Sequence, residues 1–343
     1  MSTLTKDQLP QLLAALSESA TVYVPAEIDG ISKFAPYGSA GTGEPRFDLV
    51  NTMLPPKDLL FPQSEKMYRY GIDAEGQPFI NSICESTDVV LFGIRPCDVR
   101  SIECMDDVFL TKGFADENYQ ARRQHLLTVA IGCTAPAETC FCDSMGLSPV
   151  QAPAADILLN ETADGRAWQI TAQTEKGQQA LAAAGFSADS SESTAAEVSC
   201  SLKVNTQGLA AKLDAMYDHP LWEQTARKCL TCGTCTYVCP TCHCFDISQE
   251  NRMREGTRFR SWDSCMFFAY TEMAGNHNPR ADKMPRVRQR FLHKLCFFEQ
   301  RYGKTLCVGC GRCVEKCPVA LDITVLIDQL NAAEPVQPAG EGE

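Results

Sequence analysis

Two short runs of cysteine carry the clearest chemistry in this 343-residue sequence. Residues 229–240 read C-L-T-C-G-T-C-T-Y-V-C-P, and residues 307–318 read C-V-G-C-G-R-C-V-E-K-C-P. Both follow C-x-x-C-x-x-C-x-x-x-C-P, in which three closely spaced thiolates surround one 4Fe–4S cube and the fourth ligates another. The proline ends each loop because its φ is fixed and it has no N–H donor. The two runs therefore predict two 4Fe–4S clusters.

The motif also predicts which cysteines share a cluster, because its fourth cysteine serves the cluster of the other run. The ligands predicted for the first cluster are Cys229, Cys232, Cys235 and Cys317. Those predicted for the second are Cys307, Cys310, Cys313 and Cys239. Zinc is one alternative, but zinc sites usually take two thiolates from each C-x-x-C and rarely show this triplet before C-P. Disulfides are the other alternative, and they require an oxidising compartment.

The composition favours metal chemistry in a reducing cytoplasm. The chain has 19 cysteines, and eight of them lie in the two runs. The N-terminus has no basic segment leading into an apolar core, so we predict no secretion signal and a cytoplasmic protein. No apolar run approaches the ~18 residues of a transmembrane helix. A formal charge of −12 and a pI near 5.0 disfavour a general role in nucleic-acid binding.

The elements that must position the cysteines fall into two predicted domains. Residues 1–186 are predicted to form an α/β domain, because strands alternate with helices and chemically active residues follow the strands. The strands are expected at 21–28, 88–94 and 126–131, a hairpin around 164–165, and helices at 65–70 and 99–109. Residues 187–199 are rich in Ser, Ala and Glu and are predicted to be a linker.

Residues 200–330 are predicted to form an α-helical ferredoxin-type domain with two 4Fe–4S clusters, followed by a flexible tail at 331–343. Residues 289–302 have helical spacing. Cys239 and Cys307 are 68 positions apart, so we expect a long excursion between the cluster loops. Residues 251–304 carry 12 Lys and Arg against five Asp and Glu. Such a basic face would meet an acidic partner or raise the potential of nearby clusters; the simpler interpretation is a solvated helix surface.

Several further cysteines and histidines permit more than one interpretation. A third metal or iron–sulfur centre is one hypothesis for a group in the N-terminal part of the chain, namely Cys97, Cys133, Cys140 and Cys142. Buried free thiols are the alternative. Cys242 and Cys244 are interpreted as packing residues beside the clusters, or as ligands of an additional centre with Cys265. His243 and His293 would tune the cluster potential or simply pack.

The wider set of motifs resembles a known family. It includes Gly93-Ile-Arg-Pro-Cys-Asp98, Asp116-Glu-Asn-Tyr119 with Arg122-Arg123, Cys140-Phe-Cys-Asp-Ser-Met-Gly146, Cys239-Pro-Thr-Cys-His-Cys-Phe-Asp246, Trp262-Asp-Ser-Cys265 and Arg290-Phe-Leu-His-Lys294. Together with the cysteine runs, it resembles the iron–sulfur beta subunits of cytoplasmic sulfhydrogenases and, equally, the A-type subunits of anaerobic sulfite reductases. The resemblance covers about residues 54–325.

The resemblance implies an electron-transfer role within an anaerobic, hetero-oligomeric redox complex. Electrons would pass through two 4Fe–4S clusters between two partners: a flavin-containing subunit that oxidises NAD(P)H, and a catalytic subunit of hydrogenase, sulfite reductase or sulfur reductase type. The chain itself has no dinucleotide fingerprint, since residues 38–43 lack the strand and helix of a Rossmann turn. We therefore predict that it binds neither flavin nor nicotinamide itself, and the resemblance implies a non-catalytic subunit. The alternative is that the N-terminal domain carries an additional metal or iron–sulfur centre that takes part in substrate reduction.

Overall fold

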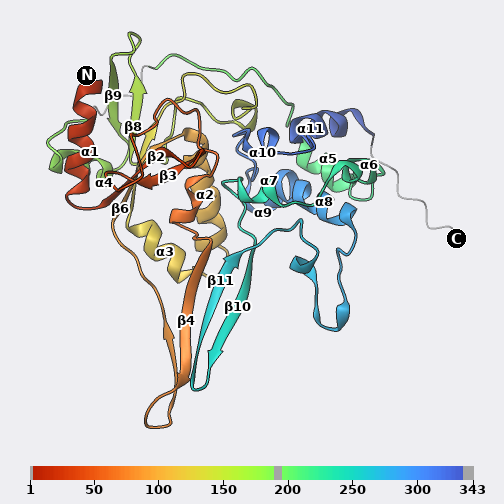
Figure 1. The fold of residues 1–343 in the computed structure, drawn as a ribbon. Coiled ribbons are helices and arrows are strands. Elements are labelled where there is room, and N and C mark those ends of the chain that lie inside the picture. Colours follow the sequence, from red (N-terminus) through yellow and green to blue (C-terminus); the bar gives the residue numbers. More distant parts are fainter. Residues whose placement is uncertain (1–2, 189–194, 335–343) are drawn as a thin grey trace. The chain divides into compact units, whose positions relative to one another are not determined.

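The computed structural model describes residues 3–188 and 195–334, which form two compact units (Figure 1). Unit 1 comprises Met1–Ala137, Leu147–Ser199 and Phe245–Trp262. Unit 2 comprises Glu138–Gly146, Cys200–Cys244 and Asp263–Glu343. The units are interleaved along the sequence, which the prediction of consecutive domains did not anticipate. Parts of the predicted linker (189–194) and tail (335–343) lie outside the described residues.

A seven-stranded mixed sheet forms the centre of unit 1, in the order β1-β9-β8-β7-β6-β2-β3. Its strands are β1 (Thr3–Thr5), β2 (Thr21–Ile28), β3 (Ile31–Pro36), β6 (Val89–Ile94), β7 (Leu126–Ile131), β8 (Ile157–Glu161) and β9 (Ala167–Ala172). The four strands β2, β6, β7 and β8 are parallel to their neighbours in that set, whereas β1, β3 and β9 pair antiparallel. The three predicted strands and the predicted β8–β9 hairpin are confirmed.

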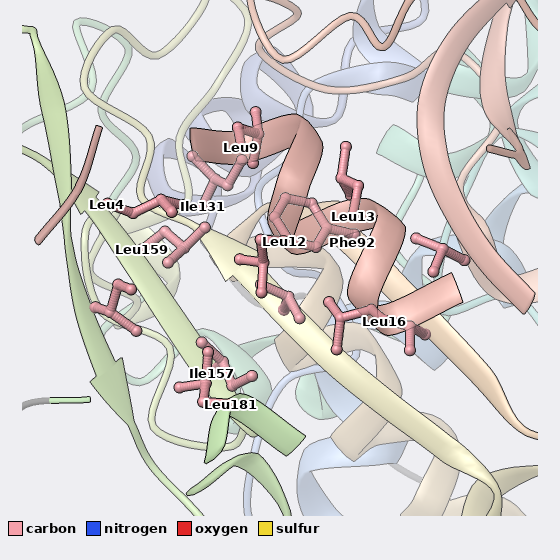
Figure 2. Close-up of a cluster of buried hydrophobic side chains, with 14 of the residues drawn as sticks. Leu4, Leu9, Leu12, Leu13, Leu16, Phe92, Ile131, Ile157, Leu159 and Leu181 are labelled. Carbon is pink, nitrogen blue, oxygen red and sulfur yellow. The ribbon is translucent and has the colours of Figure 1, made fainter. Parts of the chain in front are cut away.

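Side chains alternate along each strand, so apolar residues point to both faces of this sheet, and helices cover both faces. Val90 and Phe92 of β6 join the core under α1 (Leu9–Ser17) and α4 (Glu175–Ala183), while Leu91 joins the core under α2 (Pro96–Leu110) and α3 (Glu117–Gln124). Figure 2 shows the leucines of α1 above the strands. Two short 3₁₀ helices, η1 (Lys6–Gln8) and η2 (Pro56–Leu59), complete the unit.

A second, antiparallel sheet of unit 1 has the order β10-β11-β4-β5. Its strands are β4 (Ser64–Ile72), β5 (Pro78–Ser82), β10 (Phe245–Arg252) and β11 (Glu255–Trp262). The helix predicted at 65–70 is wrong, because this segment pairs with β11 along its length. The hairpin β10–β11 likewise departs from the helical domain predicted for 200–330. Arg260 of β11 attaches this hairpin to the rest of unit 1, because it is 1% exposed and forms ion pairs with Glu65 of β4 and with Asp116.

Unit 2 is built from short helices around one apolar core. They are η3 (Asp143–Met145), α5 (Leu209–Ala215), α6 (Leu221–Lys228), α7 (Thr234–Tyr237), η4 (Ala269–Thr271), η5 (Ala274–Asn276), α8 (Lys283–Leu292), the π-helix η6 (His293–Phe297), α9 (Phe298–Tyr302), α10 (Arg312–Glu315) and α11 (Ile323–Ala332). The helical spacing predicted for 289–302 is confirmed by α8, η6 and α9. Trp222, Phe291 and Ile327 lie at the centre of the core. Whether the unit is of ferredoxin type stays a prediction.

Within the described part of the chain, no helix has both the length and the apolar character needed to cross a membrane.

Candidate metal centre

The two cysteine runs fold into loops with the same backbone pattern. In the first loop Thr231 and Gly233 have φ of +56° and +76°, and in the second Gly309 and Gly311 have +63° and +76°. Each loop then enters a single helical turn, α7 in the first and α10 in the second. Left-handed residues at the same two positions fold each chain segment back on itself, so the sequence repeat is also a structural repeat.

The four cysteines predicted for the first cluster surround one cavity. Cys229, Cys232 and Cys235 line this cavity, and Cys317 of the second run lines it as well. Two of these sulfurs accept backbone N–H groups: Thr231 donates to Cys229 Sγ at 3.3 Å and Leu321 donates to Cys317 Sγ at 3.2 Å. Apolar side chains form much of the remaining wall, namely Met266, Val287, Phe291 and Val319.

The second set of cysteines is gathered in the same crossed manner. Burial, together with the nearby sulfurs of Cys313 and Cys239, raises the pKa of the Cys307 thiol to about 12. Burial also raises the pKa of Cys313, on which Cys239 acts too. Cys310, which lies between Cys307 and Cys313 in the second loop, is also buried. The fourth cysteine of the first run therefore lies with the second loop.

The side chains in unit 2 fit iron–sulfur clusters. Burial raises the pKa values of Cys235, Cys307 and Cys313, so these thiols resist ionisation unless positive charge is supplied beside them. Iron supplies that charge, because it binds the thiolate form. Arg290 also lines the first cavity, and its buried Nε has no hydrogen-bond partner among the described residues. Such an orphaned donor fits an acceptor sulfur.

Four cations of the basic segment are buried, which the sequence did not predict: Arg260, Arg286, Arg290 and Lys294. The last two lie at the cysteine loops. Arg290 is 5% exposed and Lys294 is 3% exposed. Lys294 Nζ donates to Cys239 Sγ at 3.1 Å and to Thr241 Oγ1 at 2.7 Å. The solvated-surface interpretation is therefore wrong for this part of α8 and η6. The available signal was the four-residue spacing of Arg290 and Lys294 on the helix face that also carries Phe291, but spacing alone does not separate a buried cation from an exposed one.

The segment Glu138–Gly146 covers the second loop. The Phe141 N–H donates to the Gly309 carbonyl at 2.9 Å. A Cβ atom at Gly309 would lie 2.6 Å from backbone atoms of Cys142, and one at Gly311 would lie 2.5 Å from Thr139 Oγ1. Only glycine permits this approach. Sequence reasoning placed the segment in the N-terminal domain, because nothing in its spacing indicates backbone packing against residues about 170 positions away.

Comparison with known proteins agrees with the geometry. A family model described as a 4Fe–4S dicluster domain matches residues 228–321, which contain both runs. The chain is also 31% identical to sulfhydrogenase 2 subunit beta of Pyrococcus furiosus, with 95% of this chain and 97% of that protein covered. The chain belongs to the sulfhydrogenase beta-subunit family. The resemblance drawn from the motifs is thus confirmed, and this family member is an iron–sulfur protein. No solved structure matches it.

The cysteines proposed for a third centre are divided between the units of this beta-subunit homologue. Cys97 begins α2 and Cys133 follows β7 in unit 1, whereas Cys140 and Cys142 belong to the cover segment of unit 2. Cys142 Sγ lies 3.6 Å from Cys200 Sγ. Across residues 3–188 and 195–334, no three His, Cys, Asp or Glu side chains converge as ligands of a single metal ion. The third centre stays a prediction.

The remaining thiols and imidazoles near the cysteine loops of this family member lie close to one another. A hydrogen bond with the Cys265 thiol lowers the pKa of Cys244 to about 6. The rings of His243 and His293 are 5.4 Å apart. Burial, followed by the charges of His243 and Lys294, lowers the pKa of His293 to about 3. His293 is therefore neutral at ordinary pH.

Proposed function

We propose that this chain is the electron-transfer subunit of a hydrogenase-type complex and holds two 4Fe–4S clusters. Cys229, Cys232, Cys235 and Cys317 ligate the first cluster; Cys307, Cys310, Cys313 and Cys239 ligate the second. When bound, the clusters supply one-electron donor and acceptor sites. The chain contributes ligation, spacing and burial, and no substrate chemistry of its own.

The crossed arrangement of the cysteines carries this proposal. Cys317 reaches the cavity of the first loop, and Cys239 acts on the thiols of the second. Each loop therefore depends on the other for its fourth ligand, which brings the two clusters into one rigid group suited to electron passage between them. A zinc knuckle does not require a ligand from a second cluster loop, because a structural zinc site is completed by four ligands around one ion.

Membership of the family supports a proposal for the partners. The Pyrococcus furiosus relative is named as the beta subunit of a sulfhydrogenase, and such a subunit works within a complex. We propose that a flavin subunit that oxidises NAD(P)H lies on one side of the relay and a catalytic subunit on the other. The proposal includes a cytoplasmic, anaerobic setting and assigns this chain neither the flavin nor the terminal reaction.

Single serine variants of the anaerobically purified chain test the ligand sets. Cys232→Ser and Cys317→Ser should remove or alter the same electron paramagnetic resonance (EPR) signal, and Cys310→Ser and Cys239→Ser the other. If Cys317→Ser altered the signal that depends on Cys310, the crossed ligation would be wrong. The reduced wild-type chain, freed of dithionite, should also deliver two electrons to an acceptor of higher potential such as methylene blue. It should evolve no hydrogen from reduced methyl viologen, because it is not the catalytic subunit.

A second candidate is that unit 1 also carries a redox centre. Arg95, Cys133 and Trp168 line a cavity at the carboxyl ends of β6 and β7, which is where α/β sheets usually bind ligands. Arg95 is largely occupied there, since it donates to the carbonyls of Gly132 and Phe47 at 3.0 and 2.7 Å. Iron in clear excess of two clusters, lost on Cys133→Ala, would favour this candidate.

A further inference from the structure

Among its described residues, unit 2 contains buried cations without a carboxylate partner, and two of them, Arg290 and Lys294, lie at the cysteine loops, whereas Arg286 donates to the backbone carbonyls of Arg280 and Ala281. Arg290 and Lys294 are 5% and 3% exposed, and neither forms an ion pair with an acidic side chain among residues 3–188 and 195–334. Buried cations are normally paired, because an isolated charge is strongly disfavoured in a low-dielectric interior. Arg260 of unit 1 illustrates the usual solution, since two carboxylates contact it. Arg290 and Lys294 therefore require another source of negative charge.

Lys294 lies where the two cysteine runs meet. Its Nζ donates to Cys239 Sγ, and its backbone carbonyl accepts the N–H of Leu306, the residue just before the second run. Thr241 completes the connection, because its hydroxyl donates to the Leu306 carbonyl at 2.8 Å and accepts from Lys294 Nζ. Lys294 is thus fixed beside a ligand of the second cluster rather than free to reach solvent.

Arg290 lies one helical turn earlier, in the wall of the first cavity. Its buried Nε has no hydrogen-bond partner in the described residues. Burial acts to lower its pKa, but the surrounding thiols, led by Cys235 and Cys313, outweigh burial and hold the pKa above its ordinary value. Because these two cysteines belong to different loops, the guanidinium lies near both loops, in the wall of the cavity at the first.

The missing negative charge is that of the clusters. A 4Fe–4S core with four thiolate ligands is anionic, and its negative charge grows by one on reduction. A fixed cation nearby stabilises the reduced form more than the oxidised form, and so raises the reduction potential. The surrounding apolar wall strengthens the effect, because water does not screen charges there.

We propose that Arg290 and Lys294 tune the electron relay by their charge. Arg290 raises the reduction potential of the first cluster, and Lys294 raises that of the second. The inference rests on the proposed function, because it presupposes two clusters with these ligands. It goes beyond that function by assigning the side chains that raise the two cluster potentials. Both cations lie on one continuous helical stretch, α8 followed by η6, so a single stretch of helix acts on both clusters.

The test is an EPR-monitored redox titration of the holoprotein and its variants, with iron and acid-labile sulfide measured on each sample. Arg290→Met should lower the reduced-to-oxidised ratio of the first cluster at least tenfold at fixed potential, which is about 59 mV for a one-electron couple. Lys294→Met should do the same to the second cluster. The charge-conserving variants Arg290→Lys and Lys294→Arg should recover most of each ratio.

Arg288→Met is the matched control, because Arg288 lies on α8 but pairs with Asp218 at 3.0 Å and stacks on Tyr217. It should leave both ratios unchanged. Unchanged ratios in both methionine variants with full iron content would overturn the inference and leave the proposed function intact, whereas a wild type lacking two clusters would overturn the proposed function itself. Iron lost in the methionine variants but kept in the charge-conserving ones supports a charge role; equal loss in both contradicts it.

Discussion

Replacing Gly309 with alanine should destabilise the second loop by more than the cost of placing alanine at a left-handed φ, because the added Cβ also meets backbone atoms of the cover segment. Two costs arise at this position. The left-handed φ of +63° costs an L-residue about 1–2 kcal/mol. The added Cβ would also lie 2.6 Å from backbone atoms of Phe141 and Cys142, which cannot rotate away, and such overpacking costs about 1–3 kcal/mol. Together they give about 2–5 kcal/mol, a large part of a typical domain's stability.

The expected consequence is a displaced cover segment and preferential loss of the second cluster. The hydrogen bond from the Phe141 N–H to the Gly309 carbonyl would lengthen first. Anaerobic thermal unfolding gives the stability change, and iron content with EPR shows which cluster is lost. Gly303→Ala is the control, because Gly303 has φ of +73° but nothing within 4 Å of its added Cβ. It should show the strain alone, about 1–2 kcal/mol. Equal stability of the two variants would refute the packing argument.

Three further predictions concern other parts of the chain. Arg260→Met should destabilise unit 1 by about 1–3 kcal/mol in urea unfolding, because Asp116 loses its cation while Glu65 keeps its ion pair with Arg122; a loss below about 1 kcal/mol would contradict this. The pKa of His293 is lowered to about 3 in the folded chain, whereas it is about 6.5 in the unfolded chain. Between these two pH values His293 is therefore protonated only in the unfolded chain. Wild-type stability should therefore fall relative to His293→Gln as the pH drops from about 6.5 to about 5, and parallel melting curves would contradict the assignment. Cys142→Ala should leave iron content unchanged if this thiol packs against Cys200, whereas lost iron would revive the third centre.

The sequence predicted what depends on local pattern and missed what depends on distant packing. The strands of the seven-stranded sheet and the four-residue spacing of α8 are periodic, so they were predictable. Residues 65–70 form a strand only because β11, nearly 190 positions later, pairs with them and buries Arg260 against Glu65. Local propensity contains no trace of that pairing.

The candidate site divides in the same way. The motif spacing alone was enough to propose the crossed ligand sets, because it encodes chemistry common to all such loops. The burial of Arg290 and Lys294 was not predictable, since a cation on an amphipathic helix is usually exposed. The cover over Gly309 was not predictable either, because Phe141 and Cys142 reach that glycine through tertiary contact.

The most direct test of two clusters in one electron-transfer chain is iron and acid-labile sulfide per chain on anaerobically purified protein, with low-temperature EPR after reduction. We predict about eight iron and eight sulfide, with two signals that broaden each other by magnetic interaction. Cys232→Ser should leave one simple signal and about half the iron. About four iron and a single isolated signal in the wild-type chain, or tightly bound zinc in place of iron, would contradict the account.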